Sequence, residues 1–194
     1  MGPEQVKAAK FYKGDPLSFE DLPYQGMVTT YAANAAITDS AAAATAIATG
    51  VKVNNGVISL AIPGDGSKLE TLLELYQKRG KKTGLLTTAH LTHATPAAFG
   101  AHETNRGYYS DIGADYRNQS RPNILFGGGG NGLDAAATAN SGYAVALNTA
   151  DFGSLDPTAE HLAGLFGTGH MAHEAAYRSA PGNSMRTCLG MLSC

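Results

Sequence analysis

A serine whose position suits nucleophilic chemistry stands at the start of a predicted helix. Asp39 and Ser40 precede the alanine-rich run 41–49, and Gly50 follows it, which is the order of an N-cap, a helix and a C-cap. The first N–H groups of such a helix have no partner within it, and this end carries the positive part of the helix dipole. Ser40 would therefore lie beside a natural site for phosphate or another anion. This stretch alone favours the competing interpretation, that Asp39 and Ser40 only cap a buried helix, because caps are common and nucleophiles are rare.

A second polar cluster follows the predicted strand 83–88 and contains His93, Thr95 and Pro96. In extended backbone, residues two apart point to the same side, so His93 and Thr95 together could hold a metal ion or its water shell. Pro96 biases Thr95 toward extended geometry and suits a helix that starts at Ala97. The alternative, favoured by spacing alone, is that Thr95 caps this helix and His93 is an ordinary surface histidine.

Arg106 and a run of four glycines are the other candidates for phosphate chemistry. Arg106 is placed at the far end of the predicted helix 97–102, and its guanidinium group could bind a phosphate in a bidentate manner. Considered by itself, it is better explained as a solvated arginine at a helix end. The glycine run 127–130 lacks the Lys-Ser or Lys-Thr pair of a phosphate loop, so we interpret it as a turn after a strand.

Two further helices and one turn are predicted from local patterns. A helix should run from Pro3 to about residue 10, because proline suits the first helical position. Ser67 and Glu70 form a capping box, which predicts a helix that ends at Gly80. The pair Asn55-Gly56 predicts a turn between two β-like runs.

Short runs between these elements predict strands over 26–30, 83–88, 123–126 and 162–166, and the last two run into glycine loops. Strands that alternate with helices indicate an α/β sheet covered on both faces. In such sheets the ligand binds outside the carboxyl ends of the strands.

Composition excludes several classes of protein. The 194 residues suit one domain with a real core, since 43% are hydrophobic and only 15% are charged. A net charge of -2 without long runs of one sign does not indicate nucleic acid or a membrane surface as a partner. No apolar run approaches the roughly 20 residues of a membrane span. The two cysteines, Cys188 and Cys194, could close only a small terminal loop.

Several of these stretches, in this order, resemble the alkaline phosphatases. The resemblance is carried by 38–41, 44–46, 49–52, 93–97 with His102 and Arg106, and 124–129, and it extends from Met1 to about Tyr177. It implies an α/β three-layer sandwich with a mostly parallel central sheet flanked by helices. It also implies metal-dependent hydrolysis of phosphate monoesters.

The resemblance implies a role for each candidate residue. Ser40 would attack phosphorus and form a phosphoserine, with its hydroxyl activated by zinc. Arg106 would bind the phosphate oxygens together with the N–H groups at the start of the Ser40 helix, and Asp39 would orient Arg106. His93 and Thr95 match the magnesium segment. Because magnesium prefers oxygen ligands, His93 would act through a bound water, or the site would accept zinc.

The family also implies a cofactor set, an assembly and a location. Its members use two zinc ions and one magnesium ion, form homodimers, and are periplasmic or secreted. The N-terminus of this chain does not have the charged-then-apolar pattern of a secretory signal, so the location is expected from family resemblance only.

The chain departs from the family pattern at both ends. Family chains begin with an apolar strand ending in Asp-Gly, whose aspartate is a metal ligand, and this chain starts after it. His161, His170 and His173 do not match the zinc ligands, and 179–194 matches nothing in the family. We therefore expect a partial alkaline phosphatase-like domain over 1–178 with an atypical tail over 179–194. The alternative function is a catalytically inactive remnant, or a phosphate-binding fragment, that lacks the zinc pair.

Overall fold

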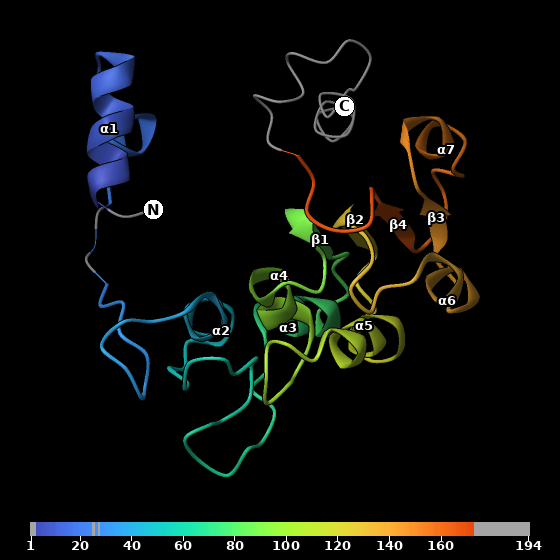
Figure 1. Cartoon of the computed structure of the whole chain (residues 1–194), viewed down its shortest axis with the longest axis horizontal. Coiled ribbons are helices and arrows are strands. Elements are labelled where there is room, and N and C mark those ends of the chain that lie inside the picture. The colour runs from blue at the N-terminus through green and yellow to red at the C-terminus, as the bar shows by residue number, and fades with distance from the viewer. Residues whose placement is uncertain (1–2, 25, 27, 173–194) are drawn as a thin grey trace.

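The computed structural model describes residues 3–24, 26 and 28–172, so the expected tail lies outside the described residues. The described chain begins with helix α1 (Pro3–Lys13) and the 3-10 helix η1 (Ser18–Asp21), which lie apart from the sheet (Figure 1). The helix predicted from Pro3 is confirmed and continues to Lys13, but none of its residues is buried. The strand predicted over 26–30 is wrong, since the described residues of that stretch form none and Val28 is 86% exposed rather than packed against a sheet.

The alanine-rich helix α2 (Ser40–Thr49) forms as predicted. The Asp39 carboxylate accepts the Ala42 N–H at 2.9 Å, and Gly50 ends the helix in the left-handed conformation with a φ of 77°. Its buried face consists of Ala41, Ala42, Ala44, Thr45 and Ala48. These small side chains let α2 pack closely on α4 (Ala94–Gly100), whose buried face is also alanine-rich.

The sheet contains four parallel strands in the order β1-β2-β4-β3. The strands are β1 (Gly84–His90), β2 (Ile124–Gly128), β3 (Ala144–Ala146) and β4 (Leu162–Leu165). The strands predicted over 83–88, 123–126 and 162–166 are therefore confirmed. The edge strand β3 is not anticipated from sequence, because three residues of Ala-Val-Ala are too short a run to mark a strand.

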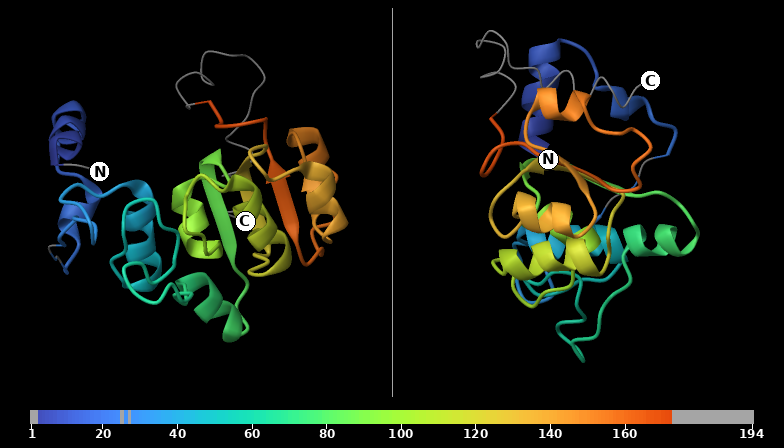
Figure 2. Two further views of the ribbon diagram at one scale, coloured as in Figure 1. Left: turned by 60° about the horizontal axis from the view of Figure 1, so that its bottom comes forward. Right: turned by 90° about the vertical axis from the view of Figure 1, so that its right-hand side faces the viewer.

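Helices flank the sheet on both faces (Figure 2). Leu85, Leu125 and Ala163 lie side by side in register on one face and share a core with α4 and with α5 (Tyr109–Asn118). On the other face, Phe126 packs edge-to-face against Phe152 of α7 (Thr149–Gly153). Helix α6 (Ala135–Asn140) contacts β3. The predicted parallel sheet flanked by helices is thus confirmed.

Strand β1 is the part of the sheet that is covered least. Leu85 is buried, whereas its neighbours Gly84, Leu86 and Thr88 are exposed, and Leu86 is 51% exposed. Because successive side chains of a strand point to opposite faces, one face of β1 is open to solvent. The expected cover on both faces therefore applies to β2, whose last four residues are all buried, but not to β1.

Two predicted helix starts are wrong. Helix α3 (Leu72–Lys78) is capped by Thr71 and not by Ser67, since Thr71 and Glu74 form the reciprocal capping box. Ser67 instead belongs to a turn in which its N–H donates to the Asp65 side chain at 2.9 Å. Helix α4 begins at Ala94, three residues before the predicted Ala97, and the residue at its N-cap is His93.

The Asn55-Gly56 turn is confirmed, with Gly56 at a φ of 86°, but its flanking runs are not strands. Within the described residues they form only isolated bridges, such as the one from Ile58 to Glu103. Across that same described part, no helix is both long and apolar enough to cross a membrane.

Candidate active site

Three stretches far apart in the sequence meet around the guanidinium group of Arg106. Its Nη1 donates to Ser40 Oγ at 2.8 Å and to Asp39 Oδ2 at 3.1 Å. Its Nη2 lies 3.4 Å from His93 Nε2. The structure therefore brings together four of the five candidate residues. Arg106 lies in a turn beyond α4. That helix ends at Gly100 and not at the predicted position 102.

The Asp39 carboxylate has both of the roles expected for it, as the cap of α2 and as the partner of Arg106. Oδ1 accepts the Ala42 N–H and so caps α2. Oδ2 accepts both the Gly56 N–H at 3.0 Å and the Arg106 guanidinium. The side chains of Asp39 and Arg106 are only 27% and 29% exposed, so water screens this ion pair less than a pair on the surface. One carboxylate thus fixes both the start of the helix and the direction of the arginine.

Asn55 and Gly56 also hold Asp39 and Arg106 in place, a role that the sequence does not predict. The Asn55 side chain accepts the Asp39 N–H at 2.8 Å and donates to the Ile37 carbonyl at 3.0 Å. The Gly56 carbonyl accepts the Arg106 N–H at 2.7 Å. The only signal in the sequence is the Asn-Gly pair itself, which by itself predicts a turn and no contact with Asp39 or Arg106. The turn ties the backbone of Asp39 to the backbone of Arg106.

His93 faces Arg106 as a neutral ring. Burial, followed by the positive charges of Arg106 and of His170 when protonated, lowers the pKa of His93 below its usual value. At neutral pH the ring nitrogen that faces Arg106 can therefore accept a hydrogen bond. His93 lies in the tight turn that ends β1, where its N–H donates to the His90 carbonyl at 2.9 Å.

Thr95 does not lie with His93 in the way the sequence predicted. The expectation that both side chains point to one side required extended backbone, but the chain is helical from Ala94 onward. Thr95 is exposed in the first turn of α4 and lines a shallow groove with Leu86 and Pro96. The role of Thr95 as a metal ligand remains a prediction without geometric support.

Two histidines that the sequence did not mark as site residues adjoin His93. The ring centroids of His90, His93 and His170 are 4.9–5.5 Å apart, and Tyr109 lies 5.0 Å from His90. Burial, together with the two neighbouring histidines, lowers the pKa of His90 to about 4. His90 ends a strand at the edge of the sheet where sites form, which is the one signal that could have indicated it. His170 comes from beyond β4 and carries no local signal.

His102, part of the family-like segment, points away from Arg106. Its Nε2 lies 2.9 Å from the Glu74 carboxylate and its Nδ1 lies 2.8 Å from the Ser59 carbonyl. The His102 side chain is only 5% exposed. This pair joins α3 to the loop that follows α4 and lies outside the candidate site.

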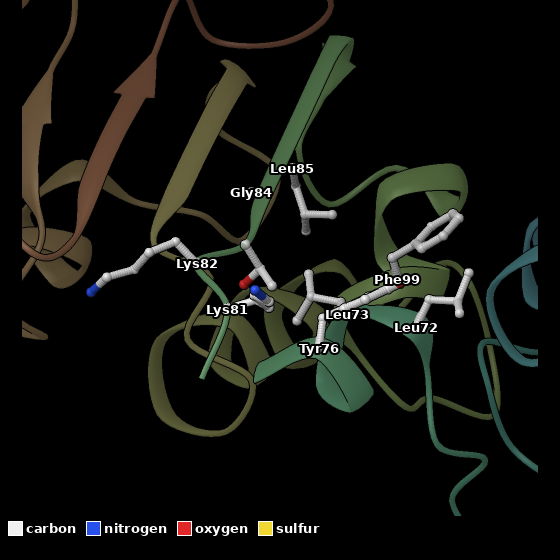
Figure 3. A pocket seen from close by; sticks show the side chains of 9 residues that line it. Leu72, Leu73, Tyr76, Lys81, Lys82, Gly84, Leu85 and Phe99 are labelled. Atoms are coloured by element: carbon white, nitrogen blue, oxygen red, sulfur yellow. The ribbon is translucent and has the colours of Figure 1, made fainter. Parts of the chain in front are cut away.

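The side chains of the described ranges do not assemble a metal centre. No group of three or more His, Cys, Asp or Glu residues among them is placed to hold a metal ion. A groove of about 320 Å³ lies at the opposite, amino end of β1 and is lined mainly by Leu72, Leu73, Tyr76, Leu85 and Phe99, with Lys81 and Lys82 at its side (Figure 3). Because ligands of open parallel sheets bind at the carboxyl ends of the strands, the Arg106 cluster is the better candidate site.

Comparisons with known proteins agree with this assignment. The family model described as alkaline phosphatase matches residues 1–140. Alkaline phosphatase 3 of Bacillus subtilis (strain 168) is 39% identical over 148 residues, which cover 69% of this chain and 31% of that relative. The crystal structure of the cold-active alkaline phosphatase from the psychrophile Shewanella sp. is 33% identical with a TM-score of 0.73, covering 89% of this chain and 45% of that one.

A mutant of TAB5 alkaline phosphatase with Mg bound is 26% identical with a TM-score of 0.76, and the match covers 90% of this chain and 52% of that one. The chain therefore spans about a third of the length of the Bacillus relative and about half the length of the similar solved structures. The family model, which covers most of the chain, and the fold and site geometry agree that this chain belongs to the alkaline phosphatase family.

Proposed function

We propose that the Arg106 cluster binds the phosphoryl group of phosphate monoesters and that Ser40 attacks its phosphorus. One observation carries the proposal: Arg106 contacts the Ser40 hydroxyl and the Asp39 carboxylate at the positive end of α2. This geometry places a nucleophile oxygen within reach of any oxyanion that the guanidinium group binds. Family membership supports the same chemistry.

The binding step follows from the donors that surround Ser40. A phosphate seated there would accept hydrogen bonds from the Arg106 guanidinium and from the N–H groups at the start of α2 that do not already donate to Asp39. Asp39 keeps the guanidinium aimed at this position while its own charge is balanced by Arg106. Because these donors are already in place, little reorganisation is needed when charge grows on the phosphoryl oxygens.

The chemical step would transfer the phosphoryl group to Ser40. A bond forms between Ser40 Oγ and phosphorus as the bond from phosphorus to the leaving oxygen breaks, and the proton lost by the Ser40 hydroxyl ends on the leaving oxygen, which departs as an alcohol. Water then attacks the phosphoserine and releases inorganic phosphate. A serine hydroxyl is a weak nucleophile until its proton is removed, so the first step needs a base or a metal in addition to Arg106.

Zinc and magnesium are the metals that family membership implies, and a bound zinc ion would supply that activation. The described donors do not fit these metals by themselves, since no group of three or more acidic, histidine or cysteine side chains in the described residues is placed for an ion. We therefore assign no step to a metal. This observation favours a second candidate function, which is phosphate binding without turnover.

Assembly, location and domain limits are also proposals. We infer a homodimer and a periplasmic or secreted location from family resemblance. The exposed aromatic side chains of α1, Phe11 and Tyr12, provide apolar surface that association would cover. We likewise propose a partial alkaline phosphatase-like domain over 1–178 and an atypical tail over 179–194.

Ser40→Ala should lower the hydrolysis of a chromogenic phosphate monoester about a thousandfold or more, because it removes the attacking oxygen. The measurement is the initial rate with and without added zinc and magnesium, followed by mass spectrometry of acid-quenched enzyme to detect phosphoserine. Ser154→Ala is the matched control, since Ser154 is exposed in a distant helix cap.

Hydrolysis that survives in Ser40→Ala would contradict the proposed nucleophile. A wild-type chain that binds inorganic phosphate but releases no product under any metal condition would support the second candidate function instead.

A further inference from the structure

The glycine run after β2 has a packing role that its sequence does not reveal. A Cβ atom on Gly128 would lie 1.8 Å from the Gly169 carbonyl oxygen. On Gly129 and Gly130 it would lie 2.8 Å from the Gly167 oxygen and 2.7 Å from the Thr168 oxygen. No side chain fits at these distances, so the run lets the segment 167–170 cross the end of β2 in backbone contact. The glycine turn predicted over 127–130 is therefore also the surface against which the segment 167–170 packs.

This crossing segment carries His170 to the end of β1. Figure 1 shows the chain leaving β4 and passing across β2 toward β1. There the His90 N–H donates to His170 Nδ1 at 3.3 Å, and the next residue, Met171, donates its N–H to the Thr88 carbonyl at 2.8 Å. Two consecutive residues thus attach to the open edge of β1 where it enters the turn that contains His93.

The His170 ring lies beside the His93 ring, the residue of the candidate site that faces Arg106. Its centroid is 5.5 Å from that of His93 in a T-shaped arrangement and 4.9 Å from that of His90. His93 Nε2 in turn lies 3.4 Å from Arg106 Nη2. His93 therefore contacts both His170 and the arginine that binds phosphate in the proposed function.

We propose that His170 is a positioning residue of the phosphate site, seated by Gly128, Gly129 and Gly130, that holds the His90–His93 turn so that the His93 ring faces Arg106. The positioning claim rests on the contacts above, and only its effect on phosphate affinity rests on the proposed function. A purely structural role would instead limit the effect of His170 to anchoring the crossing segment.

The first test measures the mobility of the His93 ring by carbon-13 relaxation in the full chain with labelled histidine. His170→Ala should lower the ring order parameter from about 0.85, typical of rigid groups, toward about 0.6. His170→Asn should restore it, because the Asn side-chain oxygen can take the place of Nδ1 as acceptor for the His90 N–H. His161→Ala is the control, since its ring packs on Tyr143 beside β3 and β4. A His93 ring that stays rigid in His170→Ala would overturn the proposal.

Gly128→Ala offers an independent route to the same change. The added methyl group must displace the Gly169 backbone, so the variant should mobilise the His93 ring as His170→Ala does. If Gly128→Ala folds and leaves the His93 ring rigid, the packing of the segment 167–170 on the glycine run does not position His170. If it fails to fold, the pair of substitutions at His170 still decides the question.

The second test asks whether His170 acts through His93. In calorimetric titrations with inorganic phosphate, His170→Ala should weaken binding about threefold in the wild-type background and leave binding unchanged in a His93→Ala background. An equal loss of phosphate affinity in both backgrounds would contradict the proposal that His170 acts through His93. If no variant binds phosphate, the proposed function fails, while the ring mobility still decides whether His170 positions His93.

Discussion

Arg106→Ala should raise the dissociation constant of inorganic phosphate about 100-fold. The guanidinium group is the only charged donor that contacts Ser40 in the described structure, and it is aimed by Asp39. Losing two charge-assisted hydrogen bonds of about 1.5 kcal/mol each costs about 3 kcal/mol, which is roughly two factors of ten in affinity. Isothermal titration of the full chain with phosphate measures this change directly.

Arg106→Lys separates the charge of this residue from its shape. Lysine keeps the positive charge but presents a single ammonium group in place of a planar fork, so the dissociation constant should rise about tenfold rather than 100-fold. Arg79→Ala is the control, because Arg79 is an exposed arginine at the end of α3. Phosphate binding that is unchanged in Arg106→Ala would contradict the proposed site, whatever the activity of the chain.

Features that depend on local interactions were predictable from the sequence. The cap at Asp39, the left-handed Gly50 and the turn at Gly56 all form as predicted, because neighbouring backbone groups decide them. The meeting of Asp39, Ser40 and Arg106 was expected only from the family resemblance. No local pattern brings a residue at position 106 to one at position 40.

Features that depend on distant segments were missed. His170 reaches His90 and His93 because the segment after β4 packs against the glycines at the end of β2. No sequence pattern near His170 or near His90 indicates this contact. The shared direction expected for the His93 and Thr95 side chains is not found either, since helix α4 begins early and replaces the extended backbone that the spacing argument assumes. The capping box moved from Ser67 to Thr71 because Thr71 Oγ also donates to the Phe99 carbonyl at 2.8 Å, a tertiary contact.

The candidate phosphate site and the packing of α3 on the rest of the fold involve different charged pairs. Arg106 and Asp39 face the site, whereas His102 and Glu74 join α3 to the loop after α4. In this second pair, the His102 side chain is 5% exposed and the Glu74 side chain is 26% exposed. A change in the second pair should therefore alter stability without altering the donors that surround Ser40. This separation allows stability and phosphate binding to be tested independently.

Glu74→Gln should lower the free energy of unfolding by about 3 kcal/mol near pH 5.5, since it leaves His102 buried without its counter-charge. Burial raises the pKa of Glu74, but the hydrogen bond to His102 and the other acceptor contacts outweigh it and lower the pKa to about 2. Burial lowers the pKa of His102, but the bonds to Glu74 and Ser59 outweigh it and raise that pKa above 6.5. The measurement is denaturant unfolding across pH.

The two pKa shifts define the pH range in which the pair stabilises the fold. The contribution of Glu74 is complete above about 4.5, its unfolded value, and is lost as the pH falls toward 2. The contribution of His102 is complete below about 6.5 and is lost as the pH rises through its raised folded pKa. The wild-type advantage over Glu74→Gln should therefore be greatest between about pH 4.5 and 6.5. Glu70→Gln, which removes an exposed partner of Lys78, should change stability by less than about 1 kcal/mol. A Glu74→Gln loss that is the same at pH 5.5 and pH 9 would show that packing, and not the charged pair, sets the cost.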